Sequence, residues 1–126
     1  MKKIINTNDA PAPLGPYNQA VLANGTLYIS GQIAIDPTTN ELITSGVEDE
    51  AKQVMKNLEA VLKAAGFTFE NVVKSSIFLS DMDNFAKINT IYGAHFNEET
   101  APARETVAVK TLPKNVNVEI SMIAVG

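Results

Sequence analysis

The stretches PARETVAVK (residues 102–110) and VNVEISMIAV (residues 116–125) decide the fold class of this chain. Both alternate apolar and polar residues with a period of two and are rich in Val and Ile, which predicts two strands that each cover a core with one face. The connector TLPKN (residues 111–115) is short, so we expect the two strands to pair as an antiparallel hairpin.

The polar faces of these two strands carry the first candidate site. The register that puts the apolar residues of both strands on the core side also groups their polar residues, because a one-residue slip turns every side chain over. Four polar residues would then share the opposite face: Arg104, Thr106, Glu119 and Ser121. An arginine fork can bind a carboxylate and a glutamate can transfer a proton. A site for a small anionic substrate is therefore one interpretation, and an ordinary ion pair on a solvent-exposed sheet is the other.

Length and composition set the broad class. The chain has 126 residues, of which 45% are hydrophobic and 19% are charged, which is typical of one globular domain spanning residues 1–126. Its formal charge is −4 and its basic residues are scattered, so we expect no nucleic-acid partner. It has no cysteine and one histidine, His95, and we expect neither a metal site nor a catalytic histidine. No segment shows the pattern of a signal peptide or approaches the length of a membrane span, so we expect a cytoplasmic protein.

Local signals predict the remaining elements. We expect a strand at 2–6 and a hairpin at 20–30, because Asn24-Gly25 suits the positive φ values of a tight turn. A helix should begin at a capping box formed by Ser45 and Glu48 and end near residue 65, before Gly66. A strand at 72–79 and a second helix at 84–97 should follow.

This order predicts an α+β fold: a largely antiparallel mixed sheet with two helices packed on one face. The helix at 45–65 should form a crossover between the first hairpin and the strand at 72–79. The uncovered face would carry apolar residues such as Ile123 and Val125, which favours self-association. Within the second helix, Asn89 falls inside the apolar stripe, so it should bind backbone or point toward a ligand.

Seven short segments together resemble the RidA family, also called the YjgF/YER057c/UK114 family, of enamine and imine deaminases. They are residues 10–17 (APAPLGPY), 30–33 (SGQI), 57–66, 85–92, 102–104 (PAR), 112–114 (LPK) and 118–120 (VEI). The similarity runs nearly from end to end of the chain.

The resemblance implies a chorismate-mutase-like fold, assembled as a homotrimer with clefts between neighbouring subunits. It implies hydrolysis of 2-enamine or 2-imine acids, such as 2-aminoacrylate and 2-aminocrotonate, to 2-keto acids and ammonia, without a cofactor. Arg104 would hold the substrate carboxylate and Glu119 would activate water and shuttle a proton.

The resemblance also assigns the residues that line the cleft: Tyr17, Ser30, Gly31, Asn89 and Thr106. The residues alone favour a packed anchor for Tyr17 and a turn former for Ser30.

The chain departs from the family pattern at two positions. Arg104-Glu105-Thr106 stands where many members have Arg-Ser-Cys, so a hydroxyl replaces the frequent cysteine. Ser121 stands where many members have a second glutamate, which leaves Glu119 as the candidate proton carrier.

Two other functions remain open from the sequence. One is a non-catalytic protein that binds keto acids or other small carboxylates and regulates isoleucine-related amino-acid metabolism. The other is the endoribonuclease or translation-inhibitor activity of some relatives, which the acidic charge disfavours.

Overall fold

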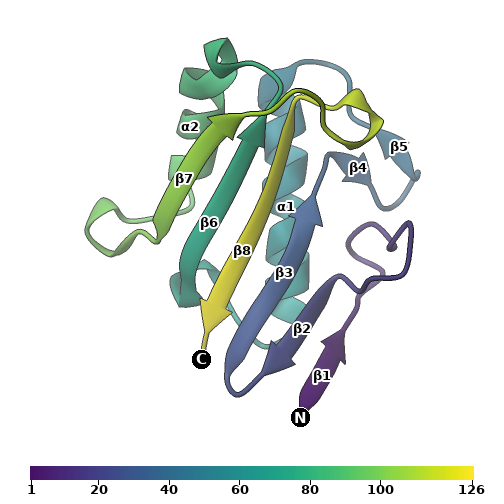
Figure 1. Ribbon diagram of the computed structural model, residues 1–126, viewed down its shortest axis with the longest axis vertical. Coiled ribbons are helices and arrows are strands. Elements are labelled where there is room, and N and C mark those ends of the chain that lie inside the picture. Colours follow the sequence, from purple (N-terminus) through teal and green to yellow (C-terminus); the bar gives the residue numbers. More distant parts are fainter.

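The computed structural model describes all 126 residues. Its main elements are a mixed six-stranded sheet and two α-helices that back it (Figure 1). The sheet strands are β1 (Lys2–Ile5), β2 (Ala20–Ala23), β3 (Thr26–Gln32), β6 (Val72–Leu79), β7 (Ala103–Ala108) and β8 (Val118–Val125). Their order across the sheet is β1-β2-β3-β8-β6-β7, and every neighbouring pair is antiparallel except β6 and β7. The short strands β4 (Ile35–Asp36) and β5 (Glu41–Leu42) pair separately.

Helices α1 (Val47–Ala64) and α2 (Phe85–Gly93) both lie on one face of the sheet (Figure 1). Alternate residues of β8, from Val118 to Ala124, are buried on that face, and the continuous core lies between the sheet and the helices. The predicted α+β class, with a largely antiparallel mixed sheet and two helices on one face, is confirmed. The second face of the sheet carries no helix and is called the open face below.

The N-terminal half follows its local signals. The strand predicted at 2–6 is β1, and the predicted hairpin is β2–β3. Asn24 and Gly25 have φ values of 51° and 78°, as the tight turn requires. The predicted crossover is also confirmed: α1 connects β3 to β6, and β8 is inserted between these two strands.

Helix α1 forms where the apolar stripe predicted it, but its predicted cap is wrong. Gly46 occupies the N-cap position without a side-chain hydrogen bond, and the Ser45 hydroxyl instead donates to Asp49 at 2.8 Å. The helix ends at Ala64 and Gly66 follows with φ 79°, close to the predicted end. A fully buried Asn57 donates to the carbonyl oxygens of Ile33 and Ile35, which fixes the chain that follows β3.

The second helix is shorter than predicted. A 3-10 turn at Met82–Asn84, capped by Asp81, precedes α2, and the α-helix ends at Gly93 instead of residue 97. The ring of Phe96 nevertheless packs 4.8 Å from that of Tyr92, and tight-turn hydrogen bonds link the backbone at 92–96. The apolar spacing therefore continues beyond the helix itself, which explains the error. His95 is exposed and stacks on Phe69 at 4.9 Å.

The hairpin predicted at residues 102–125 does not form. Both segments are strands, but β6 lies between β7 and β8 and pairs parallel with β7. The short connector between β7 and β8 therefore passes the C-terminal end of β6. Lys114 and Asn115 in this connector have φ values of 56° and 55°. Sequence alternation identified the strands without identifying their partners.

Candidate functional site

Arg104 lies on the helix-covered face of β7. It is opposite Ser75 in the parallel register, and Ser75 is fully buried beneath α2. The Arg104 Nη1 donates to the Oδ1 of Asn89 at 2.7 Å. The guanidinium carbon is 5.7 Å from the centroid of the Phe85 ring and 5.1 Å from that of Tyr92. A single cation thus sits against two aromatic rings and one amide.

Helix α2 supplies all three of these contacts from one face. Phe85, Asn89 and Tyr92 follow one another at four- and three-residue steps, which places them on the same side of a helix. Asn89 therefore does not bind backbone: its oxygen accepts a hydrogen bond from Arg104. The spacing predicted Phe85 and Tyr92 only as apolar stripe residues, because their contact with Arg104 depends on where β7 joins the sheet.

Thr106 lies on the same face as Arg104, two residues further along β7. Its Oγ1 is buried and has no hydrogen-bond partner within the chain. A buried polar group without a partner costs about 1–3 kcal/mol of stability. The side chain at the position of the family's frequent cysteine is therefore a hydroxyl that the chain itself leaves unsatisfied.

Glu119 lies on the open face of β8, next to Gly31. A Cβ atom at Gly31 would be 2.8 Å from the Glu119 Cδ, closer than real contacts allow, so only glycine leaves the carboxyl group in place. Burial raises the pKa of Glu119 above the usual glutamate range. A carboxyl group with a raised pKa can exchange a proton nearer to neutral pH.

Two local features hold the Glu119 group in position. The β3–β8 register shifts between Ile29 and Gln32, so Ser30 and Gly31 form a β-bulge beside Glu119. At the start of β8, the buried Glu50 side chain accepts hydrogen bonds from the backbone N–H groups of Asn117 and Val118, at 2.7 and 3.2 Å.

The loop before β2 adjoins this group. The Ser30 hydroxyl donates to the carbonyl oxygen of Asn18 at 2.6 Å, so it fastens the loop to β3. The preceding residue, Tyr17, is exposed, and its hydroxyl accepts a hydrogen bond from the Leu14 N–H at 3.2 Å. Ser30 therefore links the strand that carries Gly31 to the loop that carries Tyr17.

The predicted sharing of one sheet face by Arg104, Thr106, Glu119 and Ser121 is wrong. Through β6, Arg104 aligns with Met122 and Thr106 aligns with Ile120, both buried under the helices. Glu119 and Ser121 point to the open face. The predicted site residues thus form a covered-face group (Arg104, Asn89 and Thr106) and an open-face group (Glu119, Gly31 and Ser30), with Tyr17 in the loop that Ser30 binds.

Glu105 is the polar residue that β7 contributes to the open face. Its Oε1 lies 2.7 Å from Lys74 Nζ and its Oε2 accepts a hydrogen bond from Ser76. These bonds, from Lys74 first and then Ser76, hold the pKa of Glu105 below its usual range. Glu105 is therefore a paired, ionised carboxylate, whereas Glu119 has no cation beside it in the chain.

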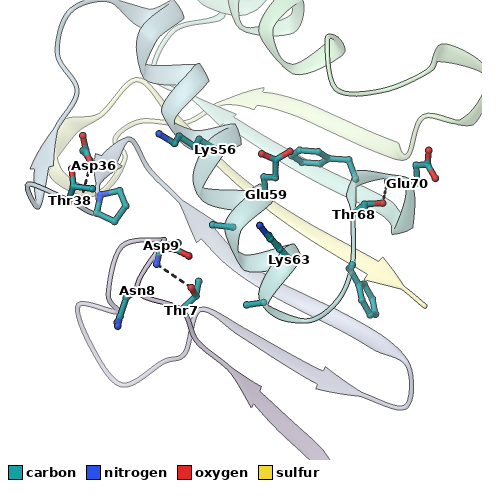
Figure 2. A pocket seen from close by; sticks show the side chains of 15 residues that line it. Thr7, Asn8, Asp9, Asp36, Thr38, Lys56, Glu59, Lys63, Thr68 and Glu70 are labelled. Atoms are coloured by element: carbon teal, nitrogen blue, oxygen red, sulfur yellow. Dashed lines mark hydrogen bonds between the residues drawn. The ribbon is translucent and has the colours of Figure 1, made fainter.

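A pocket of about 1070 Å³ lies elsewhere, between α1 and three loops (Figure 2). Lys56, Glu59 and Lys63 project toward it from α1, Asp9 approaches from a loop, and Asp36 lies at the end of β4 (Figure 2). None of the predicted site residues lines this pocket.

The side chains form no group of three or more His, Cys, Asp or Glu residues that could hold a metal ion. None of the helices is long and apolar enough to cross a membrane.

Comparisons with known proteins identify relatives over almost the whole chain. Residues 7–126 match the family model described as Endoribonuclease L-PSP. The RutC family protein slr0709 of Synechocystis is 58% identical over 98% of this chain and 95% of its own length. A Mus musculus protein named 2-iminobutanoate/2-iminopropanoate deaminase is 48% identical over 99% of this chain and 92% of its own length.

The solved structures agree with this relationship. The Rid-family protein YyfA of Yersinia pestis is 44% identical and superposes with a TM-score of 0.96, covering 100% of both chains. The family model, the identities and the shared fold give one conclusion. The chain belongs to the RidA family, the YjgF/YER057c/UK114 proteins described by the Endoribonuclease L-PSP model.

Proposed function

We propose that the protein hydrolyses reactive 2-enamine and 2-imine acids, such as 2-aminoacrylate and 2-aminocrotonate, to 2-keto acids and ammonia. The observation that carries the proposal is the state of Arg104, the only arginine of the chain. It is exposed and pairs with no carboxylate, and Asn89 occupies only one of its nitrogen atoms. The Nε and Nη2 edge is thus available for two hydrogen bonds to a substrate carboxylate.

The catalytic group would come from a second copy of the chain. Within one copy, Arg104 and Glu119 project from opposite faces of the sheet, so they cannot contact one substrate together. The open face also exposes large apolar side chains at Ile4, Tyr28, Val107 and Val125. We therefore propose a homotrimer in which Arg104 of one subunit faces Glu119 of its neighbour across each cleft.

In this cleft, hydrolysis needs only water and the side chains named above. A proton from water adds to the enamine carbon and gives the iminium form of the substrate, whose carboxylate binds Arg104. Glu119 takes a proton from a water molecule as the water oxygen attacks the iminium carbon, and then passes that proton to the nitrogen of the tetrahedral intermediate. The C–N bond breaks with its electron pair leaving on nitrogen as ammonia, and the remaining hydroxyl proton returns to water as the C=O bond of the keto acid forms. The products are ammonia and a 2-keto acid, and no cofactor enters the scheme.

The other candidate residues have positions suited to lining this cleft. Tyr17, Ser30 and Gly31 would approach the ligand from the subunit that supplies Glu119. Asn89 and Thr106 would approach it from the subunit that supplies Arg104. The unsatisfied Thr106 hydroxyl would then gain a partner in the substrate or in a bound water.

The test is keto-acid release from enamines generated in place from serine or threonine by a dehydratase. The wild-type protein should accelerate release and Arg104→Ala should abolish the acceleration. Lys87→Ala is the matched control, since it removes an exposed cation from α2 without touching Arg104. Absence of acceleration by the wild type across several enamines would refute the proposed activity.

A non-catalytic carboxylate-binding protein is the second candidate, because the same Arg104 edge would serve it and Thr106 replaces the family's frequent cysteine. Calorimetry with 2-ketobutyrate separates the two functions: binding without turnover in the dehydratase assay favours a regulatory protein.

The family model's description raises endoribonuclease activity as a further candidate. A formal charge of −4 opposes binding to a phosphate backbone. Salt-sensitive RNA cleavage that Arg104→Ala abolishes would favour it nevertheless.

A further inference from the structure

Tyr92, whose ring lies against Arg104, is itself held in place by a buried residue of the sheet. Tyr92 is 5% exposed, and its hydroxyl donates to the Ser75 Oγ at 2.9 Å. Ser75 is itself fully buried and lies opposite Arg104 in the parallel β6–β7 register. A hydrogen bond thus links the Tyr92 ring, which lies against the guanidinium, to β6, the strand beside Arg104.

We propose that Tyr92 is the positioning residue that holds Arg104 in one orientation for a ligand carboxylate. Its hydrogen bond to Ser75 fixes the ring, and Phe85 contributes a second ring contact to Arg104. An exposed arginine has several rotatable bonds and loses about 2 kcal/mol of rotamer freedom when it becomes ordered. Here two ring faces restrict the guanidinium, and Asn89 binds its Nη1. The ordering is complete before a ligand arrives, so the ligand does not have to supply it.

The chemistry of a phenol suits this role. A tyrosine ring attracts a cation through its electron-rich face and leaves the N–H edge of the guanidinium free for an anion. An ionised tyrosinate would compete with the ligand carboxylate for that edge. Burial raises the pKa of Tyr92 above 10.0, which keeps it neutral beside Arg104.

The chain offers a matched control in the same aromatic cluster. Phe96 packs on Tyr92 at 4.8 Å and on Phe69 at 5.4 Å, whereas the rings that the Arg104 guanidinium lies over are those of Phe85 and Tyr92. Replacing Phe96 by Leu removes a ring from the cluster and leaves both rings that touch the guanidinium. A purely structural role for Tyr92 predicts the same consequences for Tyr92→Leu and Phe96→Leu.

The mobility of Arg104 can be measured directly. Because the chain has a single arginine, nitrogen-15 relaxation reports its Nε–H group from one resonance. In the wild type and in Phe96→Leu, we expect an order parameter near that of rigid backbone, about 0.85, and in Tyr92→Leu a fall to roughly 0.6 or below. An unchanged value in folded Tyr92→Leu, or an equal fall in both variants, would overturn the proposal.

Ligand binding gives the second readout, which rests on the proposed function. Loss of the ring contact should weaken 2-ketobutyrate binding and raise KM roughly tenfold, with kcat retained at saturation. Equal effects in Phe96→Leu, or a fall in kcat without a rise in KM, would contradict positioning. If the wild type neither binds keto acids nor turns over imines, the proposed function fails, and the relaxation comparison still decides the role of Tyr92.

Three further variants cover the risk that Tyr92→Leu does not fold. Phe85→Leu removes the other ring, which is only half-buried, and should also loosen Arg104. Tyr92→Phe keeps the ring but leaves the Ser75 hydroxyl without a partner. Adding Ser75→Ala to it removes both hydroxyls and should restore stability toward the wild-type value. An Arg104 group that stays rigid in Phe85→Leu, when Tyr92→Leu is unfolded, would overturn the proposal.

Discussion

The two faces of the sheet carry opposite kinds of polar residue. On the covered face, Arg104 is held by two rings and an amide, although it pairs with no carboxylate. On the open face, Glu119 is partly buried without a cation beside it, and the absence of a side chain at Gly31 leaves room for its carboxyl group. Each face thus presents one charged group without its counterpart, which supports our proposal that faces of different copies meet to complete the site.

Removal of the open-face acid should give the largest effect. We expect Glu119→Ala to reduce kcat roughly 10²- to 10⁴-fold while 2-ketobutyrate binding is largely retained, because Arg104 is intact. Turnover assays and calorimetry on the same variant measure the two quantities. Glu105→Ala is the control: it removes a second open-face carboxylate, which Lys74 and Ser76 already bind, and should leave turnover near the wild-type value. Wild-type kcat in Glu119→Ala would exclude the proton-transfer role.

Displacement of that acid should be nearly as damaging. A methyl group at Gly31 would clash with the Glu119 side chain, so Gly31→Ala should lower kcat/KM by roughly 10²-fold, the usual consequence of a catalytic group misplaced by about 1 Å. Gly93→Ala is the matched control, because no atom lies within 4 Å of its added methyl group. Equal activities of the two variants would show that the position of Glu119 does not matter.

The pH dependence should identify the same group. Glu119 must be ionised to accept a proton from water, and burial raises its pKa. We therefore expect kcat/KM to rise about tenfold per pH unit along an acidic limb and to level off at a pH above 4.5, the ordinary glutamate value. The limb should be absent from the residual rate of Glu119→Gln. A limb that persists in this variant would assign the titration to another group.

On the covered face, the smallest effect concerns stability. Thr106→Val replaces the unsatisfied hydroxyl by a methyl group of similar size, so the free energy of unfolding should increase by about 1 kcal/mol. Chemical denaturation of both proteins measures this difference. If the hydroxyl serves the ligand, the same variant should lose affinity for 2-ketobutyrate. A less stable Thr106→Val would show that the hydroxyl has a partner in the native protein.

The elements that were predicted correctly are those whose signals lie close together in the sequence. Asn24-Gly25 encodes its own turn, and the apolar stripe of α1 encodes the face that the helix buries. In contrast, no local signal in or near β7 specifies which strand it pairs with. Strand alternation is satisfied equally by a hairpin with β8 and by parallel pairing with β6, so the wrong pairing placed Arg104 and Glu119 on one face.

The candidate site shows the same division. Residue chemistry singled out Arg104 and Glu119, whose catalytic roles stay predictions. The contacts of Arg104 with Phe85 and Tyr92 could not be predicted, because they require both the spacing along α2 and the parallel register of β7. The burial of the Thr106 hydroxyl could not be predicted either, because it depends on the order of the strands in the sheet.

Mixing two inactive variants tests most directly whether the two faces complete one site between copies. Arg104→Ala and Glu119→Ala would be unfolded together, refolded as a one-to-one mixture and assayed for imine hydrolysis beside each variant refolded alone. If each cleft takes Arg104 from one subunit and Glu119 from the next, random assembly should restore about a quarter of the wild-type activity. Activity no higher than that of the separate variants, with mixed oligomers demonstrated, would contradict a site shared between subunits.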